Sequence, residues 1–378
     1  MSDRRRAGAV LTIDLDAVAA NYRRLRDRAA PAECAAVVKA DAYGLGAAAV
    51  GPVLAAAGCR TFFVAHVDEG IALRKALARP PGEGASRPEP AVYVLNGLPR
   101  GAETTFARHR LTPVLNALAD VDPWAAFARR SGQPRDAALH VDTGMSRLGL
   151  PPADRARLAA DPGRLDGIRV RLLMSHLACA DEPDHPLNVG QRDAFLSLRR
   201  GFPDAAGSLA NSAGIFLGDR FHADVVRPGA ALYGLAPVPG RPNPMAQVVR
   251  LQGKILQIRE IDSPETVGYG ATHRARGRET IATVAVGYAD GYSRALSNRG
   301  SAFIGDVRVP LVGRVSMDLI TFDVSAVPPA MARPGMMVDL IGSRHPVDAL
   351  AAEAGTIGYE ILTALGARYH RVYTRSKD

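Results

Sequence analysis

Short apolar runs alternate with amphipathic stretches along the first two thirds of the chain. Runs with the length of buried strands occupy eight places: 34–39, 61–65, 91–96, 111–115, 137–142, 168–175, 207–211 and 223–227. Stretches of helical period lie at 14–30, 67–78, 118–130 and 188–200, and Asp14 or Asp16 is available to cap the first of them. Strands that alternate with helices form a parallel sheet, and eight such units within about 200 residues predict a closed (β/α)8 barrel.

The alternation breaks at 235–245, where four prolines in eleven residues indicate a linker. Beyond it, strand-like runs at 247–261, 280–288, 302–324 and 336–342 contain turn residues such as Gly305 and Asp306, and 347–365 has a helical pattern. The chain is therefore predicted to be an α/β protein of two domains. A TIM-like barrel covers 12–236 and a smaller, mainly β domain covers 237–378, with residues 1–11 left open to join the second.

Composition excludes several classes of protein. The net charge of +9 could indicate nucleic acid, but the basic residues are scattered, with no block of five and no interleaved aromatics. No run approaches the roughly 20 apolar residues of a membrane helix, and the basic start is not followed by a signal-peptide pattern. Cys34, Cys59 and Cys179 suit a reducing cytoplasm, and no pair of them has the spacing of metal ligands.

The predicted strand ends carry most of the chemistry. Active sites of such barrels lie at the C-terminal ends of the strands. In this chain those ends carry Lys39, Asn96, Asp142 with Arg147, His176, Asn211 with Ser212, and Arg227, whereas the opposite ends are bland. This asymmetry predicts an enzyme.

Lys39 is one of only four lysines among 47 basic residues, and it closes the apolar run that begins at Cys34. Desolvation there would lower the lysine pKa and make the amine nucleophilic towards the carbonyl of a cofactor. A lysine that simply reaches past a strand end to water is the alternative. Gly44 and Gly46 permit a tight turn after it, from which Tyr43 can direct its hydroxyl into the same site.

At this point the chain resembles the alanine racemase family. The segment 37–46 (VVKADAYGLG) is similar to that family's cofactor-lysine motif, and further motifs follow in the family's order over essentially the whole chain. They are 140–149 (HVDTGMSRLG), 175–178 (SHLA), 210–212 (ANS), 227–234 (RPGAALYG), 268–272 (GYGAT), 287–291 (GYADG), 313–318 (GRVSMD) and 358–360 (GYE).

The resemblance implies pyridoxal 5'-phosphate as the cofactor, carried by Lys39. Arg227 is expected to direct its guanidinium at the pyridine nitrogen, and because arginine keeps its proton, that nitrogen stays an unprotonated acceptor. The other cofactor-binding residues that the resemblance implies are Tyr43, His176, Asn211, Ser212, Gly229, Ala230 and Tyr359, among which hydroxyl and backbone N–H groups bind the phosphate.

Racemisation needs a base on each face of the substrate. The resemblance assigns these roles to Lys39 and to Tyr269, the latter from the partner subunit of an obligatory homodimer. A phenol has a pKa near 10, and the family's chain from Tyr269 through His176 to Arg227 favours its phenolate form. Arg147, Met317 and Asp318 are expected to hold the substrate. The implied reaction interconverts L- and D-alanine, either to supply D-alanine for peptidoglycan or to degrade it.

One position departs from the family pattern. Where this chain has His140, the family often has a lysine whose carbamate orients the arginine that corresponds to Arg147. A histidine cannot carry that charge. Two hypotheses remain, either a small bound anion such as chloride beside Arg147 or neutral His140 as a hydrogen-bond acceptor.

Other functions stay open at this stage. A serine racemase or one of broader specificity would share these motifs, because specificity depends on the shape of the pocket. A protein that binds pyridoxal phosphate without catalysis would have the barrel alone, so the β domain with Tyr269 counts against it.

Overall fold

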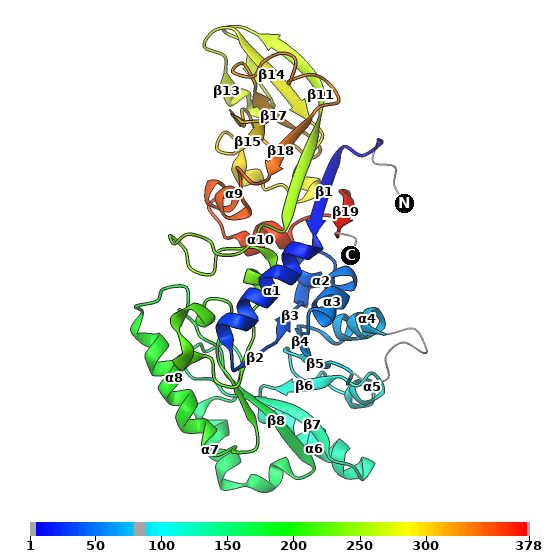
Figure 1. Ribbon diagram of the computed structural model, residues 1–378, viewed down its shortest axis with the longest axis vertical. Helices are drawn as coiled ribbons and strands as arrows, with labels where there is room; N and C mark the ends of the chain where they lie inside the picture. Colours follow the sequence, from blue (N-terminus) through cyan, green and yellow to red (C-terminus); the bar gives the residue numbers. More distant parts are fainter. Residues whose placement is uncertain (1–4, 79–87, 376–378) are drawn as a thin grey trace.

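The computed structural model describes residues 5–78 and 88–375, which form a barrel and a mainly β part (Figure 1). In Figure 1 the barrel, coloured blue to green, occupies the lower half, and the β part, yellow to orange, lies above it. No helix among the described residues is long and apolar enough to cross a membrane.

Seven strands of the barrel form one parallel sheet in chain order. They are β3 (Ala36–Val37), β4 (Thr61–Val64), β5 (Ala91–Val94), β6 (Thr112–Leu115), β7 (Arg135–His140), β8 (Ile168–Met174) and β9 (Ala206–Ser208). Each pairs in parallel with the next, and their side chains are mostly buried at the C-terminal half. Burial on both faces of a parallel sheet explains why these segments are continuous apolar runs rather than alternating ones.

The eighth strand, β10 (Val225–Val226), closes the ring. It pairs in parallel with β2 (Glu33–Cys34), and Val37 N–H donates to Pro228 O just beyond it. On its other side Asp224 N–H donates to Gly207 O in β9. The predicted α/β fold with an eight-stranded barrel is confirmed.

One helix precedes the first strand of the barrel, and the others follow its strands. They are α1 (Leu15–Ala29), the short turn α2 (Lys39–Tyr43), α3 (Ala47–Ala56), α4 (Val67–Leu77), α5 (Glu103–Arg108), α6 (Leu118–Ser131), α7 (Pro152–Ala160) and α8 (Pro186–Arg199). Periodicity located α1, α4, α6 and α8. It missed α3, which is almost uniformly apolar and contains Gly51 and Pro52, and α5, which is only six residues long.

The second part is built on an eight-stranded sheet. Its path is β16-β15-β18-β11-β1-β19, and β14 and β17 branch from β11. The bounds are β1 (Ala9–Asp14), β11 (Val249–Ile261), β14 (Glu279–Val284), β15 (Ser301–Ile304), β16 (Val307–Pro310), β17 (Ile320–Asp323), β18 (Met337–Ile341) and β19 (His370–Thr374). A small hairpin of β12 (Thr266–Val267) and β13 (His273–Arg274) and the helices α9 (Val347–Ala354) and α10 (Gly358–Thr363) complete it.

In the described part of the chain, short 3-10 helices connect these elements. They are η1 (Pro162–Leu165), η2 (Gly214–Leu217), η3 (Asp219–Phe221), η4 (Ala230–Tyr233), η5 (Tyr269–Ala271), η6 (Tyr288–Asp290) and η7 (Arg294–Leu296). Helix η4 follows β10 at the barrel opening, and η5 forms the tip of the β12–β13 hairpin.

Strand β1 ties the start of the chain to the second part. It pairs antiparallel with β11 and parallel with β19 before the chain enters α1, so both ends of the described chain lie in this sheet (Figure 1). Residues 9–14 thus pair within the second sheet, whereas residues 1–4 lie outside the described residues. The division of the chain at 236 and 237 stays a prediction.

The junction between β1 and α1 is an N-cap. Asp14 Oδ1 accepts from Asp16 N at 2.9 Å and from Ala17 N at 3.0 Å. Of the two acidic residues that the sequence offered as caps, the structure uses Asp14.

We expect Asp14→Ala to lower the free energy of unfolding by about 1 kcal/mol, because two N–H groups of the first helical turn lose their acceptor. Urea unfolding followed by circular dichroism measures this difference. Asp14→Asn retains the acceptor oxygen and should remain close to the wild type. Equal losses in the two variants would contradict the cap.

Candidate active site

A cavity of about 820 Å³ opens at the C-terminal ends of the barrel strands. Helix α10 of the second part contributes to its wall through Ile357, Tyr359 and Thr363 and their neighbours. The cavity brings together twelve of the residues singled out from the sequence: Lys39, Tyr43, Asn96, His140, Arg147, His176, Asn211, Ser212, Arg227, Gly229, Ala230 and Tyr359.

Lys39 does not end a strand as the sequence predicted. Strand β3 stops at Val37, and Lys39 begins the turn α2, in which four consecutive non-glycine residues, 40–43, have φ between 52° and 56°. Such left-handed backbone costs roughly 1–2 kcal/mol per residue. Local pattern could not predict this turn, because none of its strained positions is a glycine.

Hydrogen bonds from outside the turn offset that cost. Ala40 N donates to Glu69 Oε1 at 2.7 Å, and Ala47 N donates to Asp41 Oδ1 at 2.7 Å. Gly44, at φ 82°, closes the turn, and a Cβ there would lie 2.4 Å from Leu362 O. The turn directs both Lys39 and Tyr43 into the one cavity.

The amine of Lys39 is chemically activated by its surroundings. Burial lowers its pKa, and the positive charge of Arg147 lowers it further, while Glu69 acts in the opposite direction. A lysine with a lowered pKa has a larger fraction of neutral, nucleophilic amine at neutral pH. Lys39 is therefore suited to react with a carbonyl group.

Arg227 lies at the floor of the cavity, directly after β10. The residue is 4% exposed, and among the described residues it donates only to neutral acceptors: Ser208 Oγ, Ser175 O at 2.6 Å, His176 Nδ1 at 3.3 Å and Leu209 O at 3.5 Å. Burial lowers its pKa to about 10, so it is still a cation at neutral pH. The buried charge is thus held by dipoles rather than by a carboxylate.

This contact fixes the tautomer of His176. A guanidinium can only donate, so Nδ1 of His176 is the acceptor and Nε2 carries the hydrogen. Burial lowers the pKa of His176 well below its ordinary value, and Arg227 and Arg147 lower it further. His176 is therefore a neutral ring that offers an N–H donor from Nε2.

Ser212 and Gly229 form a small cradle beside η4. Ser212 Oγ accepts from Gly229 N at 2.9 Å and from Ala231 N at 3.2 Å, so its own hydrogen is left to donate to a ligand. A Cβ on Gly229 would lie 2.3 Å from the Tyr43 hydroxyl. Burial raises the pKa of Tyr43, so its phenol stays a protonated donor. These hydroxyls suit an anion such as a phosphate.

Tyr269, Met317 and Asp318 lie outside this cavity. Tyr269 on η5 is 73% exposed and Met317 is 54% exposed, and the Asp318 carboxylate accepts from Arg368 Nη1 at 2.8 Å. These three residues and Asp142 are therefore not among those that the cavity brings together within one chain.

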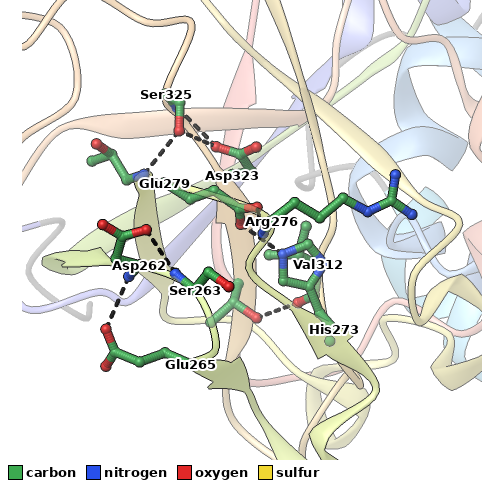
Figure 2. A network of polar contacts seen from close by, with 12 residues as sticks. Asp262, Ser263, Glu265, His273, Arg276, Glu279, Val312, Asp323 and Ser325 are labelled. Carbon is green, nitrogen blue, oxygen red and sulfur yellow. Dashed lines mark hydrogen bonds and ion pairs between the residues drawn. The ribbon is translucent and has the colours of Figure 1, made fainter.

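The hairpin that carries Tyr269 is held by a polar network. Figure 2 shows His273 in β13 beside Glu279 in β14, with Nε2 and Oε2 2.7 Å apart. At the start of the hairpin Asp262 N donates to Glu265 Oε2 at 2.9 Å (Figure 2). Tyr269 is thus an exposed side chain on a well-anchored tip.

Some residues of the site escaped the sequence reasoning. Asn116 contacts the imidazole of His140, Ser208 contacts Arg227, and Ile357 lines the cavity from α10. Asn and Ser are ordinarily turn or cap residues, so nothing local marks the first two. Ile357 adjoins the 358–360 motif, which was the one available indication.

The comparisons with known proteins agree on one family. The model described as alanine racemase, N-terminal domain, matches residues 13–237, and the one described as alanine racemase, C-terminal domain, matches residues 248–373. An alanine racemase of Rhodospirillum rubrum is 54% identical over 97% of this chain and 96% of its own. A catabolic alanine racemase of Mesorhizobium japonicum is 51% identical over 97% and 93%. The crystal structure of alanine racemase from Bartonella henselae with covalently bound pyridoxal phosphate is 39% identical over 97% of this chain and 100% of its own, with a TM-score of 0.92.

Stability should report the charge state of buried His140. Burial lowers its pKa to about 4, and Arg227 and Arg147 act in the same direction against Asp142. In the unfolded chain the ordinary histidine pKa is about 6.5. Between these values only the unfolded state binds the proton, so the stabilisation is complete above pH 6.5 and is lost as the pH falls towards 4.

We therefore expect the stability advantage of the wild type over His140→Gln to shrink by up to about 1.4 kcal/mol per pH unit across this range. Urea unfolding of both proteins from pH 8 to pH 4 measures it. Above pH 6.5 the difference should be constant, which serves as the internal control. Parallel curves through the whole range would contradict a neutral buried His140.

Proposed function

The chain belongs to the alanine racemase family and is an isomerase, and on that premise we propose that it interconverts L- and D-alanine by a two-base mechanism with pyridoxal 5'-phosphate. The observation that carries the proposal is the activated amine of Lys39 in a cavity that also contains Arg147 and Arg227. Positive charge in that cavity suits a ligand with a phosphate and a carboxylate.

Different residues of the cavity suit different parts of the cofactor. Lys39 Nζ would hold it covalently, and the hydroxyls of Ser212, Tyr43 and Tyr359 with the backbone of Gly229 and Ala230 would hold its phosphate. Ser212 suits this role because its hydroxyl oxygen already accepts two hydrogen bonds, which leaves the hydroxyl hydrogen to donate to the phosphate. Asn211 also lines the cavity, and its Oδ1 accepts from Gly214 N at 2.9 Å.

Arg227 would lie against the pyridine nitrogen. When bound, the cofactor withdraws electrons from the substrate and makes the Cα–H bond acidic. Arg227 keeps its own proton, so the ring nitrogen would stay an acceptor and the withdrawal would be moderate. Moderate withdrawal suits a racemase, because a long-lived carbanion invites side reactions.

The first base is Lys39. Its Nζ would remove or return the Cα proton of the substrate on one face. Its lowered pKa, caused mainly by burial, makes both proton transfers accessible near neutral pH.

The second base is Tyr269 of the partner subunit. Within one chain Tyr269 is 73% exposed and is not a cavity residue, so a second copy must bring it to the opposite face. There His176 can donate Nε2–H to the phenolic oxygen, with the charge of Arg227 directly behind His176. The same copy would supply Met317 and Asp318 beside Arg147, which binds the substrate carboxylate.

Alanine is the substrate that the family membership supports best. Comparing the turnover of L-alanine, L-serine and L-lysine decides between a strict alanine racemase and a broader one.

The three cysteines are free thiols, which fits a cytoplasmic enzyme. The product would enter peptidoglycan synthesis or the reaction would run towards degradation, and one of the similar proteins bears the name catabolic.

A pair of complementing variants tests the shared site. We expect the homodimers of Lys39→Ala and Tyr269→Phe to lose at least about 99% of activity, because each removes a base. A heterodimer of these two chains, purified through two different tags, should recover about half of wild-type activity, since one of its two symmetric sites is then complete.

A matched heterodimer reverses the expectation. When a wild-type chain pairs with the Lys39→Ala, Tyr269→Phe double variant, each site lacks one base and the heterodimer should be inactive. Half activity here together with no recovery in the first heterodimer would show that Tyr269 acts within its own chain. Full activity of the Tyr269→Phe homodimer would refute its role as a base.

A further inference from the structure

His140 anchors the loop that carries Arg147. The residue ends β7, and Leu150 N–H donates to His140 O at 2.8 Å, so the chain leaves the barrel at His140 and returns beside it. The imidazole is 8% exposed and lines the same cavity as Arg147. His140 and Arg147 therefore line one cavity, His140 from the start of a short loop and Arg147 from within it.

The orientation of Asn116 is fixed by its neighbours. Its amide nitrogen donates to Leu95 O at 2.9 Å and to Val114 O at 3.1 Å, which uses both of its hydrogens. The amide oxygen must then be the atom 2.8 Å from His140 Nδ1. An amide oxygen cannot donate, so Nδ1 of His140 carries the hydrogen.

The opposite nitrogen of the ring is therefore a bare acceptor. Burial and the positive charge of Arg227 keep the pKa of His140 far below neutrality, with Arg147 adding to them and Asp142 opposing them. The ring is uncharged at neutral pH, and no hydrogen bond from the described part of the chain reaches its Nε2.

Arg147 has no carboxylate partner in the part of the chain that the structure describes. Asp142, in the same loop, accepts from the backbone N–H groups of Gly144, Met145 and Ser146. Partial burial alone would raise the pKa of Asp142, but these donors outweigh it and hold the pKa below its ordinary value. Its charge is committed to shaping the loop.

We infer that His140 is a positioning residue for Arg147: its unprotonated Nε2, in the tautomer set by Asn116, would accept a hydrogen bond from the guanidinium in the substrate-bound site, a bond that the single chain does not make. The inference rests on the proposed function in so far as Arg147 binds the substrate carboxylate. A neutral acceptor orients the guanidinium and leaves its full charge for that carboxylate, whereas an acidic partner would cancel part of it.

The two histidines of the cavity thus have opposite tautomers. His176 accepts at Nδ1 and donates at Nε2, because its neighbour is Arg227. His140 donates at Nδ1 and accepts at Nε2, because its neighbour is the Asn116 oxygen. His176 can thus donate a hydrogen bond to Tyr269 of the partner subunit, whereas His140 can accept one from the Arg147 guanidinium.

Nitrogen NMR of the holoenzyme labelled with ¹⁵N-histidine tests the tautomer without any measurement of activity. The signal that His140→Gln removes should show a protonated Nδ1 and an unprotonated Nε2 between pH 6 and pH 8. His222 is the matched control, since its Nε2 lies 3.0 Å from Ile215 O and must be the protonated nitrogen. A protonated Nε2 on His140 would overturn the inference.

Kinetics of two variants test the acceptor. A glutamine at 140 can donate to Asn116 and accept from Arg147, so His140→Gln should keep the KM for alanine within about threefold, whereas His140→Leu should raise it by about tenfold or more with a smaller change in kcat. Retained cofactor absorbance and the circular dichroism spectrum verify the fold of each variant. Equal KM values for the two variants would overturn the role of the acceptor.

Chloride distinguishes the remaining alternative. With Nε2 as the partner of Arg147, the wild-type KM should not change when chloride is replaced by gluconate at constant ionic strength. A KM that falls as chloride is added would overturn the inference in favour of a bound anion. Because the tautomer is measured without substrate, a lack of racemase activity in the wild type would count against the proposed function alone.

Discussion

The site depends on one buried positive charge. Arg227 is almost fully enclosed, and its partners among the described residues are a hydroxyl, two carbonyls and an imidazole rather than a carboxylate. A buried cation without an anion is costly unless its hydrogen bonds are satisfied. These acceptors lie at the ends of the adjacent strands β8 and β9. The closed parallel sheet therefore holds the groups that stabilise the buried charge of Arg227.

The charge of Arg227 determines the state of its neighbours. It lowers the pKa of both His140 and His176, and together with Lys39 and Arg147 it makes the cavity positive. Two neutral histidines then differ only in which nitrogen carries the hydrogen, and the neighbour of each ring determines that. The uncompensated charge is left for a ligand with anionic groups, which is the electrostatic reason for a phosphorylated cofactor and a carboxylate substrate.

Parallel-strand logic could predict most of the cavity, since Lys39, His176 and Arg227 each follow an apolar run and such runs end at one face of a barrel. It could not predict the left-handed turn at 40–43, because the turn is held by Glu69 and has no glycine at its strained positions. It missed the pairing of β1 with β11, some 240 residues away in the chain. It also missed the role of Asn116, because that role depends on a long-range contact with His140. Tyr269 lies outside the cavity within one chain, and no local pattern of the sequence indicates this.

The measurement that tests the central claim most directly is borohydride reduction of the cofactor-loaded protein followed by peptide mapping. Reduction makes a covalent link to a lysine permanent, and the chain has only Lys39, Lys75, Lys254 and Lys377 to carry it. The account predicts a single adduct, on the peptide that contains Lys39, and its complete loss in Lys39→Ala. An adduct on any of the other three lysines, or a cofactor released intact after reduction, would contradict it.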